Sequence, residues 1–465
     1  MFKCLNELVD YMNIHFIGIG GIGVSALAQY YIEKGHKVSG SDLNLSGNTE
    51  LLEKKGAKIY IGEHKAENLT KDVSLVVYSP AVQSGNVELE KARKAGQGTS
   101  SVESKIQIMS YPEALGTLTR KYFTIAVSGT HGKSTTASMV ANVLIKAGFD
   151  PTVIIGTKLK EFGNSNYRAG DSKYLIIEAD EHFASFLNYN PDILILTNIE
   201  KDHLDYYKNL DNILESFRKY LSLIKEGGVL ILNKDDKNIP KLGVEKISSQ
   251  KFKVLEYSLR QEENERMKKT LKIPGDHNVS NALAVLTLSR ELKISDEVTF
   301  ETLSNYKGSW RRFEIRKSSV SGIDFLIVSD YGHHPTEVLA TLRATREKWP
   351  EKKIHFIFQP HQYQRTFYLF NDFINSFKKC LEEKLFDIAI IADIFDVAGR
   401  ESDDIRKKIN SKKLVEEIND NYVLYLKKEE ILRYLKNNIG EGDVVIIMGA
   451  GDIYKLGDQF YIEEG

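Results

Sequence analysis

The chain has 465 residues, too many for a single hydrophobic core, and about 150 residues per domain predicts roughly three domains. Its 63 basic residues nearly balance its 64 acidic residues, so there is no electrostatic footprint for nucleic acid or an anionic membrane, and we expect small-molecule partners. Two cysteines outside any disulfide or zinc pattern, and no run near the 18 or so apolar residues of a membrane span, favour a cytoplasmic protein.

Short apolar runs recur along the chain with helical stretches between them, which is the pattern of a parallel α/β sheet. The runs are 14–19, 75–78, 123–127, 174–177, 193–196, 229–232, 325–328, 355–358, 388–391 and 444–448. Polar side chains follow many of these runs, and ligands of such folds bind beyond the carboxyl ends of the strands. The pattern therefore predicts active-site clefts on an α/β scaffold.

Two soft seams divide the chain, the Gly/Ser-rich stretch 95–101 and the stretch 307–313. We use them to place an N-terminal domain at 1–110, a central domain at 111–315 and a C-terminal domain at 316–465.

The N-terminal domain carries the sequence GIGGIG between a predicted strand and a helical stretch, which fits the GxGxxG pattern in its required context. Such a turn lets a diphosphate approach a helix N-terminus, and a nicotinamide dinucleotide and a UDP-sugar both carry one. The residues alone leave these two ligands open. They indicate a Rossmann-like domain whose binding residues are Gly18, Gly20, Gly21, Gly23 and Asp42.

The sequence FTIAVSGTHGKSTT ends an apolar run at a glycine-punctuated turn with Lys133 and Ser134. Backbone N–H groups of such a turn converge on phosphate oxygens, the lysine reaches the β and γ phosphates, and the hydroxyl is a Mg²⁺ ligand. The usual P-loop has a glycine where this chain has Val127, so the match is to a shorter variant, GTHGKS. An ordinary strand-to-helix turn is the alternative. We interpret the turn as an ATP site made by Gly129, Thr130, His131, Gly132, Lys133, Ser134 and Thr135.

Glu178 and His203 follow the next strands of the central domain. A carboxylate near bound phosphates suits Mg²⁺, whereas a histidine ligand implies a second, more tolerant site, with a helix cap or surface histidine as the alternative. Asn278 and Asn281 are three positions apart on a predicted helix and share a face, so their amides can read a purine edge. Capping and turn chemistry explains these two equally well.

In the C-terminal domain, Asp330, His333 and His334 follow one apolar run, and His361 and Arg365 follow another. A carboxylate or imidazole in such a place can accept a proton from an amine, and a guanidinium can pair with a carboxylate. Structural hydrogen bonding at strand ends is the alternative.

The joint order of these motifs resembles the Mur ligase family over nearly the whole chain. The matching stretches are HFIGIGGIGVSALA, SGSDLN, VVYSPAV, GTHGKSTT, EADEHFASFL, TNIEKDHLD, IPGDHNVSNALA, WRRFEIR, SDYGHHPTEV, QPHQYQRT and GAGDIY. The resemblance implies an N-terminal Rossmann-like domain that binds a UDP-sugar, a central P-loop ATPase-type domain with a mixed sheet, and a C-terminal Rossmann-like domain that binds the amino acid.

The resemblance also implies a ligase of peptidoglycan precursor synthesis. The carboxylate of UDP-N-acetylmuramic acid attacks the γ-phosphate of ATP, and L-alanine then attacks the acyl phosphate. The alternative within the family attaches a preformed peptide to the same UDP-sugar. A nucleotide sensor or dinucleotide oxidoreductase would use the glycine motif but would not need Lys133, Glu178 and His203 together. A monomer and a homodimer are both open.

The resemblance assigns roles to the candidate residues. Catalysis falls to Lys133, Glu178, His203, Asp330 and His333. The metal ligands are Ser134, Glu178 and His203, for Mg²⁺, with Mn²⁺ as an alternative at the second site. ATP is also contacted by Asn278, Asn281 and Arg311 or Arg312. The amino acid is bound by His334, His361 and Arg365. Family members often have threonine at Ser134 and arginine at Gln362, which leaves Arg365 as the main partner of the alanine carboxylate.

Overall fold

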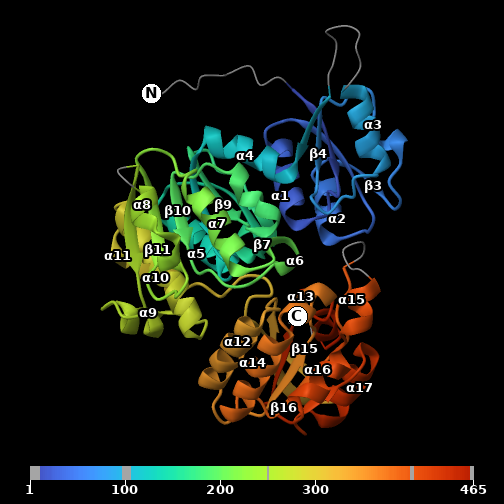
Figure 1. Ribbon diagram of the computed structural model, residues 1–465, viewed down its shortest axis with the longest axis vertical. Helices are drawn as coiled ribbons and strands as arrows, with labels where there is room; N and C mark the ends of the chain where they lie inside the picture. The colour runs from blue at the N-terminus through green and yellow to red at the C-terminus, as the bar shows by residue number, and fades with distance from the viewer. Residues whose placement is uncertain (1–10, 97–105, 249–250, 398–402, 461–465) are drawn as a thin grey trace.

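The computed structural model describes residues 11–96, 106–248, 251–397 and 403–460, so most of the predicted seam at 95–101 lies outside the described residues. These residues form three α/β domains, each built on its own sheet, as predicted (Figure 1). The N-terminal domain, in blue, lies beside the green and yellow central domain, and the orange and red C-terminal domain lies below both. The first sheet ends at Ser110 and the third begins at Glu314.

The N-terminal sheet is parallel in the order β3-β2-β1-β4-β5. The strand order reverses beside β1, and the crevice at such a switch point is where ligands bind. The predicted first strand ends earlier than expected, at Ile17, because Gly18 turns the chain with φ +79°. The elements are β1 (Asn13–Ile17), α1 (Ile22–Glu33), β2 (Lys37–Asp42), α2 (Gly47–Lys54), β3 (Lys58–Ile61), η1 (Ala66–Asn68), β4 (Leu75–Tyr78), α3 (Val87–Gly96), β5 (Gln107–Ser110) and α4 (Tyr111–Lys121).

The central sheet has the order β12-β11-β10-β6-β9-β7-β8 and is mixed, because β8 runs antiparallel to β7. Its strands are β6 (Phe123–Ser128), β7 (Thr152–Leu159), β8 (Ser165–Arg168), β9 (Tyr174–Ala179), β10 (Ile193–Leu196), β11 (Gly228–Asn233) and β12 (Phe252–Tyr257). Its helices are α5 (Lys133–Lys146), η2 (Lys160–Phe162), η3 (His182–Asn188), α6 (Leu204–Tyr207), α7 (Leu210–Leu221), η4 (Ile239–Leu242), α8 (Val244–Ser248), α9 (Asn264–Thr270), α10 (Asp276–Glu291) and α11 (Asp296–Ser304).

The C-terminal sheet has the order β13-β14-β18-β15-β16-β17, with β13 antiparallel to β14 and the other described pairs parallel. Its strands are β13 (Glu314–Val320), β14 (Ile323–Asp330), β15 (Ile354–Phe358), β16 (Ile388–Ile391), β17 (Val423–Tyr425) and β18 (Val444–Met448). Its helices are α12 (Pro335–Lys348), α13 (Tyr363–Tyr368), α14 (Phe370–Glu382), α15 (Asp403–Lys408), α16 (Ser411–Ile418), α17 (Lys428–Asn438) and α18 (Lys455–Asp458).

The N-terminal and central domains share one hydrophobic core, in which Phe16 and Leu27 belong to the same cluster as Ala126 and Tyr167. A buried polar contact also joins them, since Gln29 Nε2 of α1 donates to the side-chain oxygen of Asn166 in β8 at 3.0 Å. The C-terminal sheet packs around clusters of its own. Among the described helices, none combines the length and apolar character needed to cross a bilayer.

Candidate active site

The predicted phosphate loop joins β6 to α5 and depends on two glycines. Gly129 has φ +128° and Gly132 has φ +83°, a region that other residues rarely adopt. A Cβ atom on Gly129 would overlap Thr197 Oγ1, and one on Gly132 would lie 2.6 Å from Asn281 Oδ1. Val127 is fully buried within β6, so the loop begins after the strand rather than at the usual P-loop glycine. The construction is the strand, tight turn and helix that a phosphate site requires.

Lys133 lies at the centre of a buried polar cluster at the start of α5. Its Nζ donates to Glu181 Oε2 at 2.8 Å and to the Gly129 carbonyl at 2.7 Å, and it lies 3.8 Å from Asp180 Oδ1. Burial raises the pKa of Glu181 to about 7 even though Lys133 lowers it. Glu181 Oε1 is buried with no hydrogen-bond partner among the described residues. An unpaired oxygen of this kind suits a site that holds a cation.

Ser134 and Glu178, two of the predicted metal ligands, are in direct contact. Ser134 Oγ donates to Glu178 Oε2 at 2.9 Å, and the Gly156 N–H donates to Glu178 Oε1 at 2.7 Å. Burial raises the pKa of Glu178, and Arg312 and Lys133 act in the opposite direction. A hydroxyl beside a carboxylate is a hard oxygen set of the kind that Mg²⁺ takes, so the residues present fit that ion.

His203, the third predicted ligand, belongs to a neighbouring group of ligand atoms. One atom from each of Asp180, Glu181 and His203 lies within 4.8 Å of the others. Burial lowers the pKa of His203 to about 3, which leaves the imidazole neutral, the form that ligates metals. The residues predicted for the metals therefore fall into two adjacent clusters, one around Ser134 and Glu178 and one around His203.

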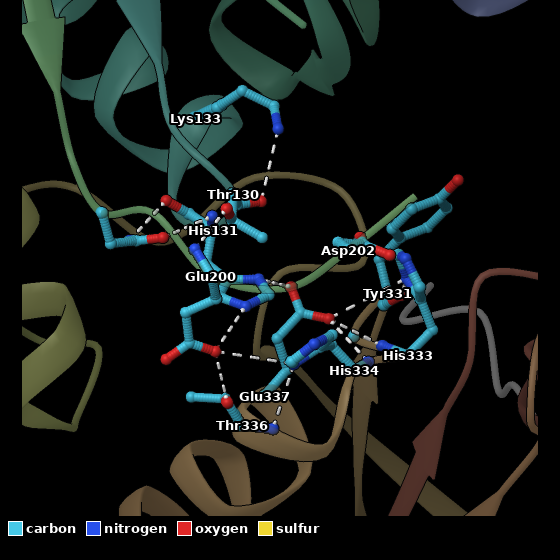
Figure 2. A network of polar contacts seen from close by, with 12 residues as sticks. Thr130, His131, Lys133, Glu200, Asp202, Tyr331, His333, His334, Thr336 and Glu337 are labelled. Atoms are coloured by element: carbon cyan, nitrogen blue, oxygen red, sulfur yellow. Dashed lines mark hydrogen bonds and ion pairs between the residues drawn. The ribbon is translucent and has the colours of Figure 1, made fainter. Parts of the chain in front are cut away.

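His131 of the phosphate loop contacts both the central and the C-terminal domains (Figure 2). Its Nδ1 is 3.2 Å from Glu337 Oε1 of α12, and its Nε2 is 3.4 Å from Glu200 Oε2. Burial would lower the pKa of His131, but the two carboxylates raise it to about 10. At neutral pH a charged histidine thus links the predicted phosphate loop to the C-terminal domain.

Asp330 and His333 lie at the carboxyl end of β14, as predicted. The two oxygens of Asp330 accept the Gly332 N–H at 2.7 Å and the Phe313 N–H at 2.9 Å. Burial raises the pKa of Asp330 to about 6 and lowers the pKa of His333 to about 4. His333 Nδ1 lies 3.1 Å from the Tyr331 carbonyl, which can only accept, so Nδ1 carries the proton and Nε2 is left with a lone pair. At pH 7 Asp330 is therefore mostly ionised and His333 is neutral, so each side chain can accept a proton.

A cavity of about 290 Å³ opens beside the phosphate loop, between α10 of the central domain and α12 of the C-terminal domain. Its walls include four of the residues predicted to contact ATP, His131, Asn278, Asn281 and Arg312, together with Asp330. Arg312 Nη2 also lies 3.4 Å from Ser134 Oγ. The cavity is therefore placed for a nucleoside whose phosphates reach the loop.

A second ligand cavity, of about 670 Å³, lies at the switch point of the N-terminal sheet. Gly18, Gly20, Gly21 and Asp42 line it, as expected for a UDP-sugar site. Asp42 Oδ2 accepts the Gly20 N–H at 2.8 Å and so holds the glycine turn in place.

Three family models match successive parts of the chain. They are described as "Mur ligase family, catalytic domain" at residues 13–123, "Mur ligase middle domain" at 127–289 and "Mur ligase, glutamate ligase domain" at 311–451. A UDP-N-acetylmuramate–L-alanine ligase of Clostridium acetobutylicum is 40% identical over 96% of this chain and 97% of its own length. The chain belongs to the Mur ligase family.

Other proteins support the same grouping. A ligase of the same name from Caldanaerobacter subterraneus is 40% identical to this Mur ligase over 98% of this chain and 99% of its own length. Among solved structures, UDP-N-acetylmuramate-alanine ligase from Thermotoga maritima matches with a TM-score of 0.75 at 27% identity, covering 97% of this chain and 98% of that chain.

Three of the predicted residues make other contacts in the structure of this Mur ligase. Arg311 is 3% exposed and donates to the carbonyls of Gly449 and Gly451, so of the two candidate arginines only Arg312 faces the 290 Å³ cavity. His334 is the N-cap of α12, with Nδ1 accepting the Thr336 N–H and Nε2 near the Lys201 carbonyl, which leaves no free ring nitrogen for an amino acid.

Gly23 is the third of these residues, and among the described residues it does not line the 670 Å³ cavity. A Cβ atom there would lie 2.7 Å from the Tyr111 ring, so this glycine permits close packing of α1 against α4.

Three residues of the site were not predicted, namely Glu181, Glu200 and Glu337. Glu181 stands two positions after a strand end, a place where a carboxylate is a reasonable candidate. Glu200 and Glu337 have no such signal, because their role depends on how the domains meet.

Proposed function

We propose that this Mur ligase joins L-alanine to the carboxylate of UDP-N-acetylmuramic acid, using ATP, in the synthesis of peptidoglycan precursors. The observation that carries the proposal is the near full-length similarity to ligases of that name, 40% identical over 96% of this chain. The arrangement of a UDP-sugar cavity, an ATP loop and a third domain around one centre supports it. We infer that the protein works in the cytoplasm, where ATP is available.

We further propose how the residues of the ATP site act. Lys133 binds the β and γ phosphates once it leaves Glu181, and Asn278, Asn281 and Arg312 bind the adenosine. Ser134 and Glu178 would hold one Mg²⁺, and His203 with Asp180 and Glu181 would hold a second cation, Mg²⁺ or Mn²⁺. When bound, these ions neutralise charge that would repel the substrate carboxylate from the γ-phosphate.

The attacking amine must lose a proton to the C-terminal domain. L-Alanine arrives as an ammonium ion, which has no lone pair for attack on the acyl phosphate. At pH 7 Asp330 is mostly ionised and His333 is neutral with a lone pair on Nε2, and we propose that one of these two accepts the proton. We propose His361 as a contact of the amino acid, with Arg365 beside it, since its Nη1 lies 3.2 Å from His361 Nδ1.

A phosphate-release assay tests the proposed function. The protein is incubated with ATP, Mg²⁺ and UDP-N-acetylmuramic acid, and then with L-alanine, with other single amino acids or with a preformed tripeptide. Release that depends on L-alanine is the expected result. Release that needs the tripeptide would assign the alternative family activity, and release with ATP alone would contradict a ligase. Chromatography of the UDP-sugar product checks that an amide has formed.

A further inference from the structure

Residues of all three domains line an open cavity of about 460 Å³, which lies between the proposed UDP-sugar cavity and the proposed metal ligands. Ser46 lines both this cavity and the 670 Å³ cavity, so the two meet at the start of α2. At its other end stand Gly156, which donates to Glu178, and Arg312, which contacts Ser134. The cavity therefore offers a route from the nucleotide of the UDP-sugar to the reacting carboxylate.

Lys158 of β7, in the central domain, lines the 460 Å³ cavity and extends toward its end at α2. Its Nζ lies 3.8 Å from the position of a Cβ atom on Gly47, the first residue of α2. The same ammonium group lies 5.5 Å from the centre of the Trp310 ring, and the Trp310 N–H donates to the Lys158 carbonyl at 3.1 Å. Both the backbone and the side chain of Lys158 therefore contact Trp310. These contacts hold the ammonium group on the side that faces the N-terminal domain.

Lys158 has no acidic partner among the described residues, since no carboxylate oxygen of that part of the chain lies within 4.0 Å of its Nζ. The side chain is half-buried, and burial lowers the pKa of the ammonium group with no neighbouring carboxylate to offset it. An anionic ligand in the cavity would stabilise this partly desolvated ammonium group, because no carboxylate of the described residues pairs with it.

We propose that Lys158 binds the diphosphate of the UDP-sugar, so that the central domain completes a site otherwise built by the N-terminal domain. The inference rests on the proposed function. The diphosphate is preferred over the reacting carboxylate because the ammonium group lies beside α2, where the two cavities meet, whereas Gly156 and Arg312 mark the end near Glu178 and Ser134. The glycine turn of the N-terminal domain lines the adjoining 670 Å³ cavity, and its N–H groups suit the same diphosphate.

Equilibrium binding of UDP and uridine, measured by calorimetry on the full chain, tests this inference. Lys158→Met should weaken UDP binding about ten- to a hundredfold, the range for a hydrogen bond to a charged group, and leave uridine binding unchanged. Lys158→Arg should restore most of the affinity. Lys160→Met, an exposed lysine two positions further on, is the matched control and should behave as the wild type.

Three results would overturn the inference. Unchanged UDP affinity in Lys158→Met would exclude the proposed contact. An equal loss of uridine affinity would indicate general damage to the site. A loss confined to UDP-N-acetylmuramic acid, with UDP-N-acetylglucosamine unaffected, would assign Lys158 to the carboxylate instead. A wild-type protein that binds no uridine nucleotide would contradict the proposed function itself.

Discussion

Arg365 of α13 pairs with Asp202 of the central domain across the domain boundary, with Arg365 Nε 2.9 Å from Asp202 Oδ1. The two side chains are each 7% exposed, so this is a buried ion pair. Burial alone would raise the pKa of Asp202, but Arg365 and His203 hold it well below its usual value. The guanidinium that was predicted to bind the alanine carboxylate is thus engaged by a protein carboxylate in this structure.

Removing either partner of this pair should destabilise the docking of the C-terminal domain. Arg365→Met leaves the Asp202 charge buried without its partner, and Asp202→Asn does the reverse, each at a cost of about 3–5 kcal/mol. The double variant should lose less than the sum of the two, because neither charge is then left alone. Urea unfolding of all four proteins measures this coupling, and strictly additive losses would contradict a direct pair.

We expect ATP binding to require Gly132, which precedes α5, but not Gly148, which follows the same helix and also has a positive φ. Gly132→Ala places a Cβ atom 2.6 Å from Asn281 Oδ1, whereas Gly148, with a similar φ of +81°, has nothing within 4 Å. Both alanine variants should lose about 1–2 kcal/mol to backbone strain. We expect only Gly132→Ala to lose binding of an ATP analogue in calorimetry. Equal affinity in the two variants would show that the loop tolerates a side chain.

Lys133→Ala should abolish turnover and leave binding of the UDP-sugar intact. Loss of one charged donor to a transferring phosphoryl group lowers kcat by about 10²–10³ or more. Lys146→Ala, at the other end of α5 and half exposed, is the control and should keep its activity. Phosphate release gives the rate and calorimetry gives the UDP-sugar affinity. Loss of that affinity with the fold unchanged would contradict the assignment of the sugar to the N-terminal domain.

The sequence predicts the scaffold and both glycine turns because their signals are local. Apolar runs and turn residues report on neighbours within a few positions, and every predicted run became a strand. The ten runs correspond to ten of the 18 strands in the described residues. The edge strand β13 is among those missed, since one face is open to solvent and its residues, EIRKSSV, are mostly polar.

Contacts between domains could not be predicted, because no local sequence pattern indicates which residues of different domains meet. Arg365 and Asp202 are 163 positions apart, and His131 and Glu337 are 206 apart. The neighbours Arg311 and Arg312 also look alike in sequence. Arg311 takes φ +55°, and the turn sends its side chain into the C-terminal domain while that of Arg312 reaches Ser134.

Because His131 is charged in the folded protein, its contribution to the free energy of unfolding should decrease as the pH rises above neutrality. Its folded pKa of about 10 lies above the roughly 6.5 of an unfolded histidine. Between these values the folded protein holds a proton that the unfolded chain does not, so the stabilisation is complete below about pH 6.5 and is lost as the pH rises through 10. His131→Gln keeps a polar side chain but cannot take up that proton.

The difference in urea midpoint between wild type and His131→Gln measures this effect from pH 7 to pH 10. Glu200, Glu337 and the His334 ring, 4.7 Å away, face His131 in both proteins, and the comparison cancels their own contributions to first order. At pH 7 the urea midpoint of the wild type should be higher than that of His131→Gln, and this difference should shrink steadily toward pH 10. An advantage that stays constant or grows with pH would mean that His131 is neutral between the two carboxylates.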